Sequence, residues 1–229
     1  MKMTFMDASA EIIQGLRQRL LAWGAVQNKE YPWRYQSNPY RVLVSEFMLH
    51  RTQTRQVLPV YKLFIQRWPS LANYAQANGA EVNFILSPLG LKWRVQGMQQ
   101  ALTTLWKNYG TVPTDYDKLI CVRGIGPYIA GATVCFTQNQ PIKLADSNIV
   151  RVIGRVLGLD LSGEARRRRS VIDAIAAACD PLQPRDFYYA VIDLAHEICH
   201  PRRPACGCCP LRDLPCVNQV HNNGEVKSD

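Results

Sequence analysis

The chain has 229 residues, 47% of them hydrophobic, which is enough to bury a substantial core as one domain or two small ones. Its 27 Lys and Arg against 18 Asp and Glu give a formal net charge of +9, which favours a polyanionic partner, nucleic acid or a membrane surface. No apolar run approaches the roughly 18 residues of a membrane helix, and residues 1–7 lack the apolar segment of a signal peptide. We therefore expect neither membrane insertion nor secretion.

Apolar residues at helical spacing follow one another along the chain, separated by short polar loops. The helices they predict are 11–26, 42–51, 57–67, 70–77, 81–86, a long helix from Gly90 to about Tyr109, then 117–122, 127–138, 148–157, 171–178 and 186–198. No segment alternates between apolar and polar residues as a half-buried strand does. The expected fold class is all-α.

A glycine turn connects two of these helices, and residues 122–132 read VRGIGPYIAGA. Glycine at Gly124 and Gly126 allows a positive φ and a close approach to another surface. Pro127 suits the first turn of a helix, where its missing N–H costs nothing. The free N–H groups there could bind a phosphate, although an ordinary turn between core helices explains the glycines equally well.

Two acids and one basic run have competing explanations. Glu46 lies among the apolar positions of the 42–51 helix, so it is paired, exposed on the far face, or kept for chemistry. Asp146 directly precedes Ser147, which we predict to be the N-cap of the 148–157 helix, although Asp146 could itself cap that helix. The four arginines of residues 166–169 are better explained by a solvated helix start than by a DNA contact.

Five of the eight cysteines fall within residues 199–216, which indicates a metal or cluster site rather than disulfides. The candidate ligands are Cys199, Cys206, Cys209 and Cys216. Zinc and an iron–sulfur cluster both accept four thiolates, and spacing alone favours zinc. The other cysteines, Cys121, Cys135 and Cys179, lie in apolar helical patterns and are expected to be core thiols.

Four stretches occur in a fixed order: PWR at 32–34, PYRVLVSEFMLHRTQT at 39–54, the glycine turn, and ADSNIVRV at 145–152, followed by the cysteines. This order resembles the helix-hairpin-helix base-excision DNA glycosylases, in the branch of the adenine and the thymine/uracil–guanine mismatch glycosylases. The resemblance extends from about residue 16 to residue 216. It implies a six-helix barrel-like lobe of residues 31–143, and a second lobe of 1–30 with 144–229, on either side of a DNA-binding cleft.

The resemblance also implies that the 199–216 loop holds a [4Fe–4S] cluster through the four candidate ligands. The last cysteine interval is one residue longer than is usual in the family, and Cys208 adds a spare thiol beside Cys209. Which of these two thiols is the ligand therefore stays open. We also hypothesise that the cluster shapes a basic loop, with Arg202, Arg203 and Arg212, that contacts phosphates.

In the family, the reacting nucleotide is flipped into a pocket, at a cost of a few kcal/mol in stacking and pairing. Asp146 matches the aspartate that stabilises positive charge on the sugar, and Glu46 matches the acid that assists departure of the base or positions water. DNA contacts are implied for a larger set. His50 and Arg51 occupy the wedge position, and Arg123, Gly124 and Gly126 are expected at the phosphate backbone.

Tyr128 is the departure that most affects the expected reaction. Bifunctional relatives such as endonuclease III carry a lysine here, whose amine forms a Schiff base with the sugar, and a tyrosine cannot. The thymine/uracil–guanine mismatch enzymes carry a tyrosine. The expected function is therefore a monofunctional glycosylase that removes thymine or uracil opposite guanine.

Two alternatives stay open. One is an adenine glycosylase without the C-terminal domain that reads 8-oxoguanine, because the chain stops about a dozen residues after Cys216. The other is a DNA-binding module without catalytic activity. We expect a monomer in the cytoplasm, associated with the nucleoid, whose partner is double-stranded DNA with a mispaired or damaged base.

Overall fold

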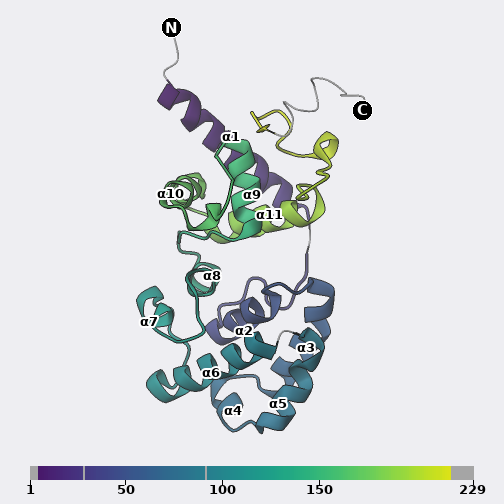
Figure 1. Ribbon diagram of the computed structural model, residues 1–229, viewed down its shortest axis with the longest axis vertical. Helices are drawn as coiled ribbons and strands as arrows, with labels where there is room; N and C mark the ends of the chain where they lie inside the picture. Colours follow the sequence, from purple (N-terminus) through teal and green to yellow (C-terminus); the bar gives the residue numbers. More distant parts are fainter. Residues whose placement is uncertain (1–4, 28, 91, 218–229) are drawn as a thin grey trace. The chain divides into compact units, whose positions relative to one another are not determined.

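The computed structural model describes residues 5–27, 29–90 and 92–217, and every regular element in these residues is a helix (Figure 1). The all-α fold class predicted from the sequence is confirmed. The chain divides into two compact units: the first comprises Met1–Asn28 with Pro141–Asp229, and the second comprises Lys29–Gln140. Among the described helices, none has the length and hydropathy needed to span a membrane.

The first unit is built around one buried helix, α11. Its elements are α1 (Phe5–Ala25), α9 (Ser147–Val156), η2 (Ala165–Arg167), α10 (Arg169–Ala178), α11 (Pro184–Glu197) and η3 (Cys206–Cys208). Helix α11 packs against both α1 and α9. Helices α1 and α11 approach so closely that a Cβ at Gly24 would lie 2.8 Å from the Cβ of Ala190. Glycine at position 24 therefore sets the spacing of these two helices.

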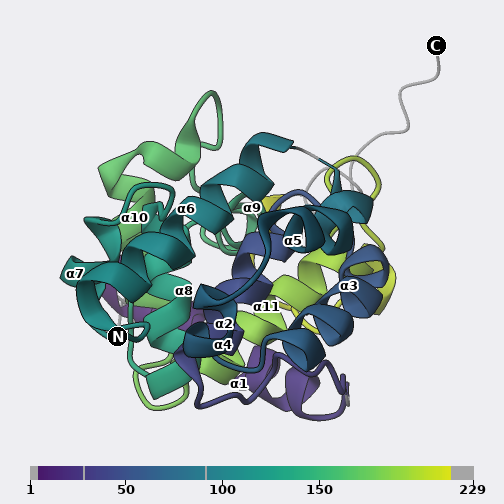
Figure 2. The same ribbon diagram turned by 90° about the horizontal axis from the view of Figure 1, so that it is seen from below.

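The second unit is built around α2. Its elements are α2 (Pro39–Leu49), α3 (Thr54–Arg67), α4 (Leu71–Ala75), α5 (Gly79–Leu86), η1 (Ser87–Leu89), α6 (Lys92–Tyr109), α7 (Tyr116–Ile120) and α8 (Pro127–Gln138). Helix α2 contacts α3, α6 and α8, and Figure 2 shows it beside α8. Asn38 caps α2, because its side-chain oxygen accepts hydrogen bonds from the N–H groups of Tyr40 and Arg41.

Predicted and observed helices agree best where strong local signals mark the ends. Helix α8 begins at Pro127 and ends at Gln138, as predicted, because Asn139 takes a left-handed conformation that ends the helix. Cys135 and Cys179 are buried as expected. The prediction for Cys121 was wrong: it is exposed, because it caps the short helix α7 at the start of the turn.

Candidate functional site

The glycine turn between α7 and α8 is anchored by its apolar residues. Ile125 donates a backbone hydrogen bond of 3.0 Å to the carbonyl of Val122, and both side chains are buried. Gly124 lies between them with φ of 96°, and a Cβ there would lie 2.8 Å from the carbonyl oxygen of Gly97 on α6. Both features predicted for Gly124, a positive φ and a close backbone approach, are confirmed.

The same prediction was wrong for Gly126. Its φ is −88° and its ψ is 171°, which is extended backbone, and a Cβ there would meet nothing within 4 Å. The reason is that Gly126 is the N-cap of α8, a position that takes extended dihedrals. Its carbonyl accepts the first helical hydrogen bond from Ala130, at 3.0 Å. Pro127 follows as the first helical residue and Arg123 is exposed, so the start of α8 is open to an anion.

Two of the predicted catalytic residues lie on neighbouring helices of the second unit. Glu46 is buried in α2, with 7% of its surface exposed, and Tyr128 is half-buried in the first turn of α8. Helices α2 and α8 pack directly on each other. The predicted wedge residues follow at the end of α2: His50 is its C-cap, and the exposed Arg51 has a left-handed φ of 62°.

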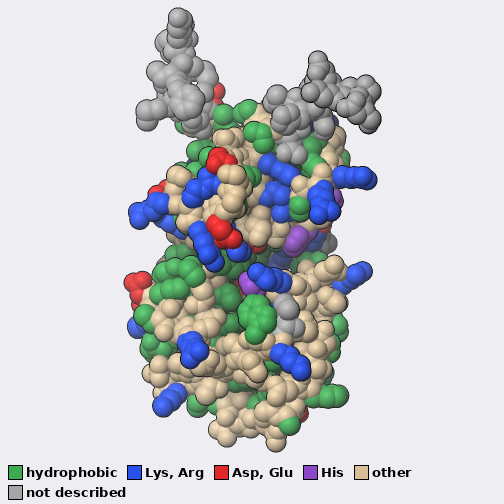
Figure 3. Space-filling view, in the orientation of Figure 1, with side chains coloured by type: hydrophobic (Ala, Val, Ile, Leu, Met, Phe, Trp, Pro, Cys, Tyr) green, Lys and Arg blue, Asp and Glu red, His purple; other side chains and the backbone are tan. Residues whose placement is uncertain are grey.

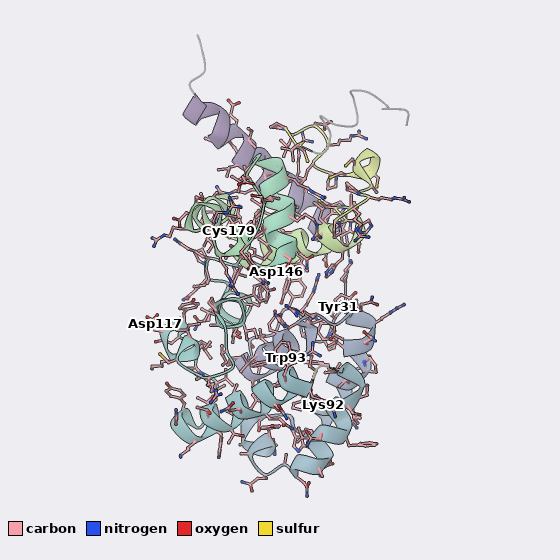
Figure 4. The ribbon with its side chains drawn as sticks, in the orientation of Figure 1. Tyr31, Lys92, Trp93, Asp117, Asp146 and Cys179 are labelled. Atoms are coloured by element: carbon pink, nitrogen blue, oxygen red, sulfur yellow. The ribbon has the colours of Figure 1, made fainter. Side chains whose placement is uncertain are left out.

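Asp146 lies at the start of α9 in the first unit, where Figure 4 labels it. Its side chain accepts a 2.7 Å hydrogen bond from the N–H of Ile149, so Asp146 is the N-cap of α9. The prediction that Ser147 caps this helix was wrong, because Ser147 already belongs to its first turn. Tyr188 of α11 anchors the segment that leads from α8 to Asp146, because its hydroxyl donates to the carbonyl of Ile142 at 2.9 Å.

The electrostatic setting of Asp146 combines opposing effects. Burial raises the pKa of its carboxyl group, whereas hydrogen bonds from Ile149 and Asn148 and the charges of His196 and Arg151 lower it. Burial is the larger effect, so the pKa lies above the ordinary aspartate value. The first-turn N–H groups of α9 are donors that favour the ionised form. The carboxylate is thus held in place beside a helix dipole that stabilises its charge.

Sequence reasoning missed two arginines that connect α9 to the cysteine loop. Arg151 donates to the side chain of Asn148 at 3.0 Å and to the carbonyl of Cys199 at 2.8 Å. Asn148 in turn donates to the second oxygen of Asp146 at 3.3 Å. Arg155, one turn further along, donates to the sulfur of Cys199 at 3.2 Å. Their spacing of four residues, which places both on one helix face, was the available signal.

The cysteine loop lines a cavity in the first unit. Its lining includes Cys199, Cys206, Cys209 and Cys216, together with Val152, Val156, Leu194, Ile198 and Leu211. Cys208 does not line the cavity; it is exposed, and its sulfur contacts the carbonyl of Ala205 at 3.3 Å. In the described residues, no three potential ligands converge on a point where a single metal ion could sit. The four thiols instead line the wall of the same cavity.

The arginines of residues 166–169 form ion pairs within the first unit. Arg166 and Arg167 pair with Glu164, and the next two pair with Asp160 and Asp173. All of these pairs are exposed. Figure 3 shows Lys and Arg side chains across the visible face of this unit, with acidic groups among them. The solvated explanation, favoured from the sequence, fits these contacts.

Known proteins resemble the chain in sequence over nearly its whole length. It is 33% identical over 227 residues to a thymine-DNA glycosylase of Aeropyrum pernix, covering 96% of this chain and all of the relative. It is 32% identical over 198 residues to a thymine/uracil-DNA glycosylase of Pyrobaculum aerophilum, covering 82% and 84%. An adenine DNA glycosylase of Mycobacterium tuberculosis is also 32% identical, and the match covers 84% of this chain but 64% of that protein. No protein-family model matches the chain.

Solved structures resemble the fold. A thermostable thymine-DNA glycosylase superimposes with a TM-score of 0.85 at 23% identity, over 93% of this chain and all of that one. Endonuclease III in a non-covalent complex with DNA superimposes with a TM-score of 0.78 at 18% identity, over 97% of this chain and all of that one. At these identities the superpositions establish the fold.

Proposed function

Because the chain belongs to the helix-hairpin-helix superfamily of DNA glycosylases, we propose that it is a monofunctional enzyme that removes thymine or uracil opposite guanine. The names of the relatives from Aeropyrum pernix and Pyrobaculum aerophilum support these two bases. The basic net charge of +9 fits a polyanionic substrate, which here is double-stranded DNA.

One observation carries the monofunctional part of the proposal: a tyrosine follows the glycine turn. Tyr128 is the second residue of α8, directly after Gly126 and Pro127, and its side chain is half-buried. A phenol cannot form the Schiff base that begins strand cleavage in a lysine enzyme. Base release would therefore leave an abasic site in an intact strand.

Asp146 is suited to the charge that develops in this reaction. Breaking the N-glycosidic bond builds positive charge on the sugar, and a preorganised carboxylate close to that charge stabilises it. The hydrogen bonds from Ile149 and Asn148 fix both oxygens of the Asp146 side chain before substrate binds. In this proposal Glu46, buried in α2, assists the departing base or positions water, and Tyr128 packs on the flipped nucleotide.

The cysteine cavity fits a [4Fe–4S] cluster. Four thiols around one cavity match a group that takes one thiolate at each of several iron atoms. Burial and the neighbouring thiols raise the pKa of Cys209 to about 11, so a cationic centre beside it is needed to keep this thiol ionised. When bound, the cluster would supply a rigid, charged support for the loop. Iron and sulfide analysis of anaerobically purified protein tests this assignment, and stoichiometric zinc without sulfide would refute it.

A panel of duplexes tests the proposed substrate. Four oligonucleotide duplexes with T·G, U·G, A·G and A·8-oxoguanine pairs are incubated with excess protein, and the released bases are separated and identified. We expect thymine and uracil, with no adenine. The sequence identity of 32% to an adenine glycosylase makes adenine the competing result, and release of adenine alone would overturn the choice of substrate.

Asp146→Asn distinguishes an enzyme from a DNA-binding module. The amide oxygen can still accept the hydrogen bond from Ile149, so the start of α9 keeps its cap. We expect the variant to bind a T·G duplex about as tightly as the parent protein and to release no base. Unchanged base release would remove Asp146 from the mechanism.

A further inference from the structure

Arg94 is a buried cation in the second unit. It lies in the first turn of α6, only 4% of its surface is exposed, and burial lowers its pKa. It belongs to the buried face of α6, together with Met98, Ala101, Leu102 and Leu105. In the described part of the chain, Arg94 forms no ion pair with a carboxylate, and its hydrogen bonds go to neutral oxygens. Burying a charge costs free energy, and here only hydrogen bonds to neutral oxygens offset that cost.

These hydrogen bonds go to two segments of the chain. One terminal nitrogen donates to the carbonyl of Met48 at 3.3 Å, to the carbonyl of His50, and to the hydroxyl of Thr52 at 2.8 Å. The other terminal nitrogen donates to the carbonyl of Leu89 at 3.1 Å, at the end of η1. The guanidinium therefore clamps residues 48–52, where α2 ends, to the turn that leads into α6.

The hydrogen bonds of Arg94 add to one local bond in this segment, from the N–H of Thr52 to the carbonyl of Leu49 at 3.2 Å. The last carbonyls of a helix lack helical partners and carry the negative end of its dipole, so a cation stabilises them. Arg51, between the clamped residues His50 and Thr52, has a left-handed φ of 62°, which a residue with a side chain seldom adopts. This conformation persists because contacts on both sides fix the backbone.

The neighbouring residue on α6 supports the same segment. The ring of Trp93 lies edge-on to the ring of His50, with 6.3 Å between ring centroids and 86° between planes. Trp93 is 56% exposed, and Figure 4 labels it near the start of α6. Trp93 and Arg94 thus hold the side chain and the backbone of His50 respectively.

We propose that Arg94 is a positioning residue that preorganises His50 and Arg51 to fill the gap left by the flipped nucleotide. This inference rests on the proposed glycosylase function, and it concerns base flipping rather than the chemical step. Preorganisation matters because a small displacement of positioning groups can slow a reaction by about a hundredfold.

The test compares Arg94→Met and Arg94→Lys with the parent protein. Methionine has a similar length and removes every donor, whereas lysine keeps the charge but cannot donate to both segments as a planar fork can. Flipping is followed by stopped-flow fluorescence of 2-aminopurine placed beside the thymine of a T·G pair, and base release is measured under single-turnover conditions. For Arg94→Met we expect flipping and base release to slow together, by about ten- to a hundredfold, with affinity for an abasic duplex nearly unchanged. The rates of flipping and base release for Arg94→Lys should lie between those of Arg94→Met and the parent protein.

The control is Arg67→Met, which removes an arginine of the same unit from an exposed ion pair with Glu81 and should leave flipping unchanged. Should Arg94→Met fail to fold, Thr52→Val removes one of the four acceptors with little change of shape and should slow flipping severalfold. A double-mutant cycle then decides the mechanism: if Arg94 acts through the wedge, Arg94→Lys has no further effect on flipping in a protein that carries His50→Ala and Arg51→Ala.

Two results would overturn the inference: normal flipping in both Arg94→Lys and Thr52→Val, or an undiminished effect of Arg94→Lys in the His50→Ala and Arg51→Ala background. Failure of the proposed function is distinguishable, because the parent protein would then release neither thymine nor uracil from a duplex with guanine opposite, whether or not the fluorescence changes.

Discussion

Replacing Gly124 by alanine tests how the glycine turn between α7 and α8 packs against α6. The new Cβ meets two obstacles: a φ of 96°, and the carbonyl oxygen of Gly97 at 2.8 Å. A left-handed backbone costs about 1–2 kcal/mol for a residue with a side chain, and relieving an overpacked contact costs about 1–3 kcal/mol. We therefore expect Gly124→Ala to lose roughly 2–5 kcal/mol of unfolding free energy. In a protein of this size the melting temperature should fall by roughly 4–20 °C.

Gly126→Ala is the matched control, two residues further along the same turn. Its backbone is extended, and a Cβ there meets nothing within 4 Å. The poorer N-cap and the reduced freedom of the unfolded chain roughly offset each other, so the unfolding free energy should change by less than about 1 kcal/mol. Urea denaturation of both variants, followed by far-ultraviolet circular dichroism, measures the difference. Equal stability of the two variants would refute this account of the turn.

Three further predictions concern the candidate site. Burial raises the pKa of Asp146, so its charge lowers the stability of the protein above that pKa, and this cost disappears as the pH falls through it. The melting temperature of Asp146→Asn should therefore be no lower than that of the parent at pH 7, and the two melting temperatures should converge in acid. Asp146→Ala loses the cap of α9 and about 1 kcal/mol of unfolding free energy. If melting curves place the asparagine variant well below the parent, the burial argument fails. Tyr128→Phe should keep single-turnover base release within about threefold, while Tyr128→Ser should slow it about ten- to a hundredfold, because a stacked aromatic ring contributes about 1–3 kcal/mol per base; equal rates in the two variants would exclude stacking. Cys208→Ser should retain the iron content of the parent and Cys209→Ser should lose it, since Cys209 lines the cavity and Cys208 does not, and the reverse order by metal analysis would reassign the ligand.

The sequence predicted the helices well because most of them carry strong local signals. Pro127 and Asn139 bound α8, and apolar positions at helical spacing mark the buried faces of the longer helices. The errors fell where one residue could fill two roles. Asp146 and Ser147 are both good N-caps, and only the backbone geometry shows that Asp146 takes that position. Gly126 was assigned a positive φ because glycine permits it, although an N-cap requires extended backbone.

The side-chain networks were beyond sequence reasoning for a different reason. Arg94, Arg151 and Arg155 resemble solvated charges on helices, yet each donates to backbone carbonyls that belong to another part of the chain. Such partners are set by tertiary packing, so the sequence signal for them is weak. For Arg94 the signal is its helical spacing from Met98 and Leu105, which places it on the buried face of α6.

In the proposed function, this protein cuts the bond to a mispaired pyrimidine and leaves the DNA strand whole. Mass spectrometry of one T·G duplex after a single turnover, without alkali or heat, tests it most directly. We expect free thymine and a full-length strand that has lost that base and carries a water-derived hydroxyl at the sugar. A strand already broken at the site, or an intact strand that still carries its thymine, would contradict it.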